Sequence, residues 1–121
     1  MPDLITYLLP DFSFSDDRGW LYQLCRDGWT QVNVSKSVKG VKRGGHYHKQ
    51  TWEAFFIVDG KIRLRLEQGD QTEELTVKTG DFFCFPPFVK HSFEFESDTV
   101  MVALYDKGVE LPDGTKDIYT E

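Results

Sequence analysis

All three histidines of the chain lie in two short blocks that contain the residues best suited to chemistry. The first block has the spacing Gly40-x5-His46-x-His48-x4-Glu53-x6-Gly60, and the second has Gly80-x5-Pro86-x4-His91. Three imidazoles and a carboxylate can bind a divalent metal, and imidazoles with a pKa of about 6.5 can also take up and return protons near neutral pH. The two blocks therefore predict a site for metal binding or proton transfer.

Strand geometry would bring these four side chains together. His46 and His48 are two positions apart, so on a β-strand they point to the same face. Glu53 begins the next predicted strand, and His91 has the same parity as the phenylalanines that follow it, which we expect to face the core. We therefore expect the four groups to meet in an aromatic-rich interior. For any one histidine alone, a hydrogen-bonded core residue remains an open interpretation.

The elements that must position the site are predicted to be β-strands. Short apolar runs alternate with turn signals, and no stretch longer than about ten residues keeps a helical period, which predicts an all-β barrel or sandwich. Asp59-Gly60 is expected to form the turn of a tight hairpin between the runs 53–58 and 61–66, with Ile62, Leu64 and Leu66 facing inward. Further strands are predicted at Glu74–Val77, Phe82–Phe85, His91–Phe95 and Thr99–Tyr105.

Length and charge limit the class of protein. The 121 residues predict a single domain over 1–121, with core motifs at 40–60 and 80–95. The net charge of −6 argues against a general nucleic-acid or anionic-membrane surface. The first fourteen residues contain no Lys or Arg and resemble neither a signal peptide nor a membrane span, so a cytoplasmic location is expected.

Two further features bear on the surroundings of the domain. Cys25 and Cys84 are far apart in the chain and are expected to be reduced, buried thiols. The run Thr99–Tyr105 is apolar at both parities, so we expect both of its faces to be covered, in one interpretation by a second subunit. The sequence therefore predicts a homodimer.

The two blocks resemble the two sequence motifs of the cupin superfamily. The first motif matches at all five positions, whereas in the second Phe88 stands at the usual glycine and Phe95 at the usual asparagine. The resemblance implies a jelly-roll barrel or sandwich. Because cupins include dioxygenases, isomerases, epimerases, sugar-binding regulators and storage proteins, the fold alone does not name an activity.

A narrower resemblance covers roughly residues 16–106. The segments Asp16–Leu21, Gln31–Ser35 and Lys39–Lys49 are similar to the dTDP-4-keto-6-deoxyhexose 3,5-epimerases, and the chain resembles more closely the sugar-nucleotide 3,4-ketoisomerases, which carry a like Arg-Gly-x-His-x-His-Lys run. This implies an isomerase that acts on a dTDP-4-keto-6-deoxyhexose in surface-polysaccharide biosynthesis.

The same resemblance implies roles for particular residues. His46 and His48 would be the acid/base pair that moves the keto group between C4 and C3. Arg43 and Arg18 would bind the diphosphate of the nucleotide-sugar substrate, because an arginine fork suits phosphate geometry. Independently of the resemblance, Tyr47 and His91 are expected to line the substrate pocket, because Tyr47 lies between the paired histidines and His91 faces the same interior.

The use of a metal is left open by the sequence. The ketoisomerases work without one, whereas the cupin domain of capsule-sugar reductases has a similar Arg-Gly-Gly-His-Tyr-His run and holds zinc. Two possibilities follow: no cofactor is required, or one divalent metal (Zn, Fe, Ni or Mn) binds His46, His48, Glu53 and His91. A metal-dependent cupin, isomerase or dioxygenase, acting on a small oxygen-rich substrate is the first alternative function. A non-catalytic sugar-binding cupin is the second.

Overall fold

The computed structural model describes residues 4–120, and within that range it contains eleven β-strands and no helix. The prediction of an all-β chain is therefore confirmed. The strands are β1 (Thr6–Tyr7), β2 (Phe12–Asp16), β3 (Gly19–Gln23), β4 (Gln31–Ser37), β5 (Lys42–His46), β6 (Glu53–Asp59), β7 (Lys61–Gln68), β8 (Gln71–Lys78), β9 (Phe82–Phe85), β10 (Lys90–Phe95) and β11 (Thr99–Tyr105).

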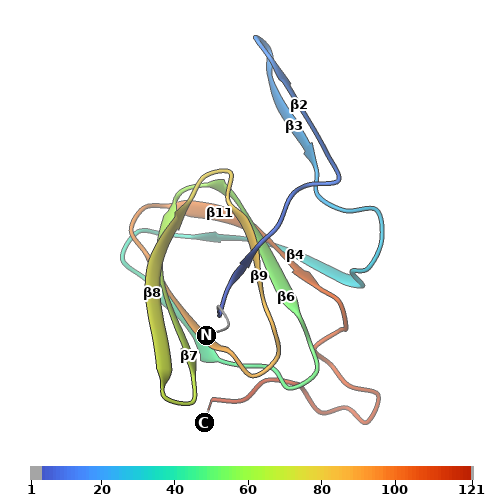
Figure 1. The fold of residues 1–121 in the computed structure, drawn as a ribbon, viewed down its shortest axis with the longest axis vertical. Helices are drawn as coiled ribbons and strands as arrows, with labels where there is room; N and C mark the ends of the chain where they lie inside the picture. The colour runs from blue at the N-terminus through green and yellow to red at the C-terminus, as the bar shows by residue number, and fades with distance from the viewer. Residues whose placement is uncertain (1–3, 121) are drawn as a thin grey trace.

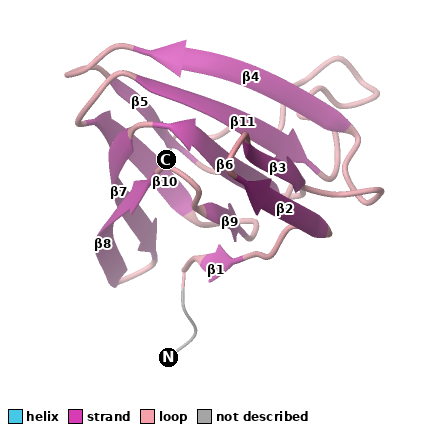
Figure 2. Ribbon diagram, turned by 90° about the horizontal axis from the view of Figure 1, so that it is seen from above, coloured by secondary structure: helices cyan, strands magenta, loops and turns pink. Residues whose placement is uncertain are grey.

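Two antiparallel sheets face each other around one core (Figures 1 and 2). One has the strand order β1-β9-β6-β11-β4, and the other has the order β5-β10-β7-β8. Strands β2 and β3 form a separate hairpin that projects away from the sheets (Figure 1). Among residues 4–120 no helix is long and apolar enough to cross a membrane.

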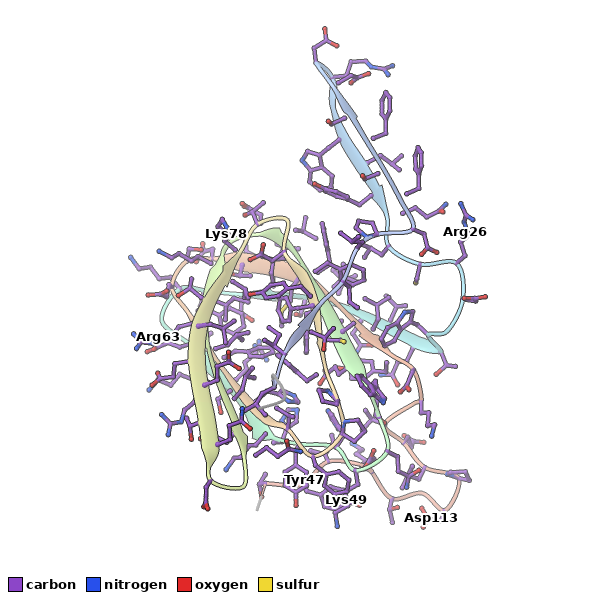
Figure 3. The ribbon with its side chains drawn as sticks, viewed as in Figure 1. Arg26, Tyr47, Lys49, Arg63, Lys78 and Asp113 are labelled. Carbon is purple, nitrogen blue, oxygen red and sulfur yellow. The ribbon has the colours of Figure 1, made fainter. Side chains whose placement is uncertain are left out.

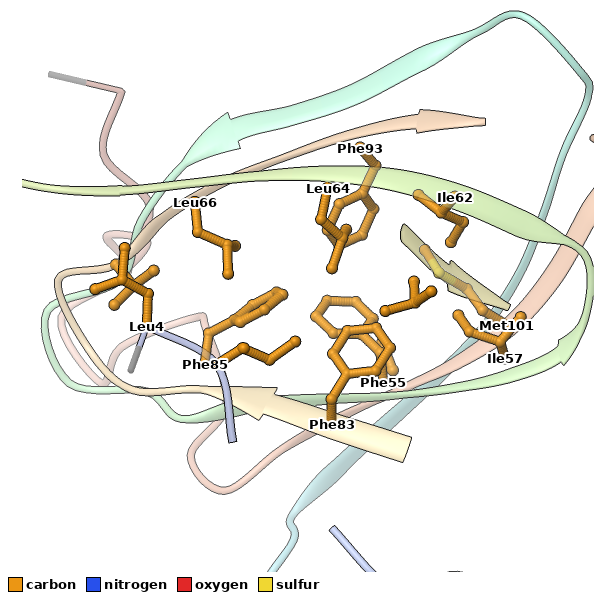
Figure 4. Close-up of a cluster of buried hydrophobic side chains, with 14 of the residues drawn as sticks. Leu4, Phe55, Ile57, Ile62, Leu64, Leu66, Phe83, Phe85, Phe93 and Met101 are labelled. Carbon is orange, nitrogen blue, oxygen red and sulfur yellow. The ribbon is translucent and has the colours of Figure 1, made fainter. Parts of the chain in front are cut away.

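The core between the sheets follows the alternation expected from the sequence. Ile62, Leu64 and Leu66 of β7 are fully buried, and the arginines between them are exposed. Side chains from the opposite sheet meet them, including Phe55 and Phe83 (Figure 4). This packing of apolar rows from two sheets supplies the main stabilisation of the barrel.

The expected hairpin at Asp59-Gly60 is wrong, because this turn crosses from one sheet to the other. Strand β6 pairs with β9 and β11, whereas β7 pairs with β8 and β10. Gly60 has a φ of 136°, and a Cβ at this position would collide with the side chain of Thr99. The glycine is thus required by a close approach of two chain segments rather than by a two-residue hairpin turn.

The outer face of β11 is covered in part by the chain itself. Val102 and Leu104 belong to a second apolar cluster, which the N-terminal segment joins through Leu24 and Trp29. This explains why both parities of β11 are apolar without requiring a second subunit at that strand. Of the two cysteines, Cys84 is buried and Cys25 is half-buried, and both are free thiols.

The neighbouring edge strand, β4, is not covered in this way. Val32 and Val34 lie on the same sheet face as the covered residues of β11, yet they are 59% and 71% exposed. The projecting hairpin also exposes apolar side chains, among them Phe14 and Leu21. The molecule therefore presents an apolar strand and an apolar hairpin to its surroundings.

The C-terminal segment returns to the barrel without forming a strand. Residues 117–119 form no strand, and they pair with the barrel through a single antiparallel bridge, between Tyr47 and Tyr119. The two residues exchange backbone hydrogen bonds of 2.8 and 3.0 Å. These bonds attach the segment beside the first histidine block.

Candidate acid/base and metal site

Three strands and one turn bring the two sequence blocks together. His46 ends β5 and is paired with His91 near the start of β10, and Glu53 begins β6. His48 lies two residues beyond the end of β5. One potential ligand atom from each of the four residues lies within 4.8 Å of the others, so the predicted convergence is confirmed.

The carboxylate of Glu53 is the centre of this cluster. Its Oε1 lies 3.0 Å from Nε2 of His48 and also 3.0 Å from Nε2 of His91. Glu53, His48 and His91 are buried, whereas His46 is half-buried. A ligand that enters the site from solvent therefore meets His46 before the other two rings.

The opposite ring nitrogens bind backbone carbonyls. Nδ1 of His48 donates to the carbonyl of Asp117 at 2.6 Å, and Nδ1 of His91 lies 3.1 Å from the carbonyl of Val89. A carbonyl can only accept, so these contacts place the ring hydrogens on Nδ1 and direct both Nε2 atoms toward Glu53.

This arrangement fits a bound cation. Nε2 of His91 is fully buried and makes no hydrogen bond of good geometry, although Oε1 of Glu53 is within 3.0 Å. Two nitrogen lone pairs and a carboxylate oxygen directed at one point are satisfied by a proton or by a metal ion. His46 completes a three-histidine, one-carboxylate donor set of the kind that Zn, Fe, Ni or Mn accepts.

Electrostatics separate the pKa values of the histidines. Burial, together with an unfavourable electrostatic interaction with His91, lowers the pKa of His46 to about 4. Burial also opposes ionisation of His48, but hydrogen bonds to Glu53 and to the Asp117 carbonyl outweigh it, so the pKa of His48 is raised. The result is a neutral imidazole and a readily protonated one whose ring centroids are 5.2 Å apart. Such a pair is suited to acid/base work.

The same partners hold Glu53 as an anion. Burial alone would raise the pKa of its carboxyl group, but the hydrogen bond with His48 and the close approach of His91 outweigh that effect and lower it to about 2. Aromatic rings enclose this charge, since Phe85 stacks on His91 at a centroid distance of 4.9 Å and Phe55 lies 6.3 Å away. Water is thereby kept from one side of the cluster.

Tyr105 is a site residue that the sequence did not reveal. Burial raises the pKa of its phenol above the ordinary value, and the adjacent Glu53 raises the pKa further, while Asn33 opposes the shift. Its ring also meets His48 edge-on at 6.4 Å. The signal that could have identified it is its parity with Ala103, which faces the core.

The other predicted substrate residues lie outside the four-residue cluster. Arg43 lies three residues before His46, and its Nε donates to Oγ of Ser37 at 2.7 Å. That bond links the edge strands of the two sheets. Arg43 also lines a surface hollow that is formed largely by outward-facing side chains of the same sheet.

Tyr47 and Arg18 lie elsewhere. The ring of Tyr47 packs against Phe88 and Tyr119 at the end of the barrel, with Lys49 nearby (Figure 3). Arg18 is at the turn of the projecting hairpin, where its side chain is 81% exposed and pairs with Asp16. Among residues 4–120, the side-chain partners found for Tyr47 and Arg18 therefore belong to other parts of the fold.

A glycine next to the cluster allows the two histidine-bearing strands to approach. Gly44 has a φ of 91°, and a Cβ there would lie 2.6 Å from the carbonyl oxygen of His91. The pairing of β10 with β5 changes register at this point, between His91 and Ser92. The close approach and the bulge together set the distance between His46 and His91.

A surface hollow of about 380 Å³ lies on the other side of this sheet. Its walls include Arg63, Arg65 and Glu94, whose side chains alternate with the core residues of β7 and β10. The hollow is therefore separated from the histidine cluster by the sheet itself.

Comparisons with known proteins agree with this architecture. Residues 36–105, more than half of the chain, match the family model of the cupin domain. A comparison with curated protein sequences gives no match. Among solved structures, the 3,4-ketoisomerase QdtA from Thermoanaerobacterium thermosaccharolyticum, in complex with TDP, is 17% identical with a TM-score of 0.81, over 100% of this chain and 90% of that one.

Two other solved structures are similar over most of this chain. The dTDP-4-dehydrorhamnose 3,5-epimerase from Sulfolobus tokodaii is 21% identical with a TM-score of 0.72, over 91% of this chain and 74% of that one. The capsular polysaccharide assembling protein CapF from Staphylococcus aureus is 25% identical with a TM-score of 0.66, over 89% of this chain but only 31% of that one. The ketoisomerase and the epimerase, at these identities, share the fold with this chain.

Proposed function

The chain belongs to the cupin domain family, and from this premise we propose that it is a sugar-nucleotide isomerase that interconverts the 4-keto and 3-keto forms of a dTDP-linked 6-deoxyhexose in surface-polysaccharide biosynthesis. The observation that carries the proposal is the meeting of His46 and His48, 5.2 Å apart, beside the buried Glu53. A fold shared over the whole chain with a 3,4-ketoisomerase supports it, because a variant of that enzyme has been solved with TDP-4-keto-6-deoxyglucose.

The reaction requires only proton transfers. The C3–H bond of the 4-keto sugar breaks, its proton passes to a base, and O4 receives a proton, which gives an enediol with a C3–C4 double bond. O3 then loses its proton while C4 gains one, so the products are a 3-ketone and a C4 hydroxyl. No electrons leave the sugar, and no oxidant is needed.

The two histidines divide these steps between them. His46 is neutral near pH 7 and half-buried, so it accepts the C3 proton. His48, whose pKa is raised, supplies a proton to the developing oxyanion at O4. Arg43 binds the diphosphate in this proposal, because a guanidinium suits phosphate geometry and Arg43 lies on β5, the strand that ends at His46.

Deuterium incorporation tests this proposal directly. The protein is incubated with dTDP-4-keto-6-deoxyglucose in deuterium oxide, and the sugar protons are followed by NMR beside a protein-free blank. We expect label at the carbons next to the ketone, well above the blank, and its loss in His46→Asn and His48→Asn. Asp113→Asn is the matched control, because Asp113 is exposed and bonds only within its own turn. Deuterium labelling no faster than in the protein-free blank would refute the proposed isomerase activity. Tight TDP binding without labelling of the sugar would favour a sugar-binding cupin.

A metal-dependent cupin acting on a small oxygen-rich substrate is the second candidate, favoured by the unpartnered Nε2 of His91. His46, His48, Glu53 and His91 would hold the ion. When bound, a divalent metal polarises a carbonyl oxygen and stabilises an enolate. Elemental analysis and turnover after chelation separate the candidates. If turnover survives the removal of stoichiometric metal, the proton-transfer enzyme is supported. If turnover is lost on removal and returns when the metal is added back, the second candidate is supported.

The functional unit is a homodimer in this proposal. Each copy has an uncovered apolar strand at Val32 and Val34 and a projecting hairpin with the exposed Phe14 and Leu21. In a two-fold arrangement the hairpin of each copy covers β4 of the other copy. A single interface then buries both hairpins and both β4 strands. A second copy of the chain is therefore the occupant that suits this surface.

A further inference from the structure

Asp117 is a buried carboxylate that lies outside the four-residue cluster but contacts it. Its side chain has 0% exposure, and it lies 69 residues along the chain from His48. A buried carboxylate requires several partners to offset its lost hydration. The identity of these partners points to its role.

The carboxylate of Asp117 binds the turn that directly follows His48. Oδ1 accepts the backbone N–H of Lys49 at 2.8 Å, and Oδ2 accepts those of Gln50 at 2.9 Å and Thr51 at 3.2 Å. The hydroxyl of Thr51 also donates to Oδ2, at 3.1 Å. Three consecutive amides directed at one anion fix the backbone of this turn.

The backbone of the same residue binds the ring of His48. Nδ1 of His48 donates to the Asp117 carbonyl at 2.6 Å, which leaves Nε2 facing Glu53. Asp117 is held in place from the other side, since its own N–H donates to the carbonyl of Val109 at 2.8 Å. One residue therefore fixes both the ring of His48 and the turn that leads from it to Glu53.

We propose that Asp117 is the positioning residue of the site: its carboxylate anchors the turn 49–51, and its carbonyl binds Nδ1 of His48 and so keeps Nε2 directed at Glu53. This orientation does not depend on which reaction the site performs. Only the effect on turnover rests on the proposed ketoisomerase function.

Asp117→Asn tests the proposal, with Asp106→Asn as its matched control. Asp117 uses both carboxylate oxygens, so an amide there must place its NH2 group against N–H donors. Asp106 stabilises the other end of the same loop through one oxygen, which accepts the N–H of Trp52 at 2.8 Å, and an asparagine can keep that bond. The two substitutions make the same chemical change, but only one disturbs the neighbour of His48.

The first readout is the orientation of the His48 ring in crystal structures of the parent and the two variants. We expect Nδ1 within hydrogen-bond distance of the residue 117 carbonyl, with Nε2 facing Glu53, in the parent and in Asp106→Asn. In Asp117→Asn we expect a displaced turn 49–51 and a rotated His48 ring. The second readout is turnover. We expect kcat to fall about 10- to 100-fold in Asp117→Asn, with KM changed by less than about threefold, as for other residues that orient a functional histidine.

A milder variant covers the case in which Asp117→Asn does not fold. Thr51→Val removes one of the four hydrogen bonds to the carboxylate, and we expect a smaller displacement of the turn and of the His48 ring. An unchanged His48 ring in a folded variant, or equal changes in Asp106→Asn, would overturn the proposal. A ring orientation that depends on Asp117 in a protein that turns over no sugar nucleotide would refute the proposed function and leave the positioning role intact.

Discussion

His48 and His91 direct their Nε2 atoms at the same oxygen, Oε1 of Glu53, at 3.0 Å each. The two rings approach from different parts of the chain, and their Nδ1 atoms bind separate backbone carbonyls. Neither ring can turn away from the carboxylate without breaking its outer hydrogen bond. Glu53 is therefore the group on which the electrostatics of the cluster depend.

Replacement of this carboxylate should destabilise the protein strongly. Glu53→Gln keeps the shape of the side chain but leaves a buried, readily protonated imidazole without its counter-charge. We expect a loss of about 3 kcal/mol in the free energy of unfolding, measured by urea denaturation near neutral pH. In the control, Glu67→Gln, an exposed pair with Arg65 is lost, and the change should stay below about 0.5 kcal/mol. Equal effects of the two substitutions would contradict the central role of Glu53.

The stability of the metal-free protein should fall as the pH is lowered from 6.5 to 4. The pKa of His46 is about 4 in the folded protein against an ordinary value of 6.5, so in this range the unfolded chain binds more protons. Proton uptake by the unfolded chain favours unfolding. The measurement is the midpoint of urea unfolding at several pH values with a chelator present, and His46→Gln should flatten the curve in this range.

Two other groups act in different pH ranges. The pKa of Glu53 is lowered from 4.5 to about 2, so its contribution to stability is complete above pH 4.5 and is lost as the pH falls toward 2. The raised pKa of His48 has the opposite sign, since its contribution is complete below pH 6.5 and is lost as the pH rises through the folded-state value. A pH profile of His46→Gln that matches the parent between 4 and 6.5 would refute the assignment to His46.

Gly44→Ala should destabilise the protein by more than about 2 kcal/mol. The new Cβ would meet the carbonyl oxygen of His91, and the φ of 91° already disfavours a side chain. Gly69→Ala is the control, because Gly69 also has a positive φ, 59°, but open space around it. Gly69→Ala should lower the free energy of unfolding by only about 1 kcal/mol, measured by thermal or urea denaturation. A similar cost at both positions would mean that contact with His91 is unimportant.

A charge on the uncovered strand should separate the subunits. Val34→Asp places a carboxylate on the outer face of β4, where burial in an interface would be costly. We expect a dimer for the parent and a monomer for the variant in sedimentation analysis at micromolar concentration. Thr76→Asp, an exposed position on the outer face of the other sheet, should leave the mass unchanged. A parent that is monomeric at every concentration would contradict the proposed dimer.

Local patterns predicted the local structure and the composition of the site. Alternation of apolar and charged residues predicted the inward row of β7, since burial on one face requires it. The spacing of His46 and His48 and the parity of His91 predicted the cluster, because each histidine lies on or directly beside a strand that faces the core.

Relationships across the fold could not be predicted in this way. The turn at Asp59-Gly60 was predicted, but turn residues do not specify which sheet receives the next strand, so the pairing of β6 with β7 was wrong. Tyr105 and Asp117 reach the site through contacts with residues more than 50 positions away. No local pattern marks such contacts, and a lone aspartate before a short apolar pair resembles any loop residue.

The bond between His48 and Asp117 also bears on the order in which the molecule folds. Residues 31–105 contain all the strands of the barrel except β1, so the two sheets can pair before residues 117–119 dock. A barrel at that stage can already be compact, yet the ring of His48 still has no carbonyl to hold it. The barrel should therefore form earlier than a fully oriented site, which requires residues 117–119 to dock.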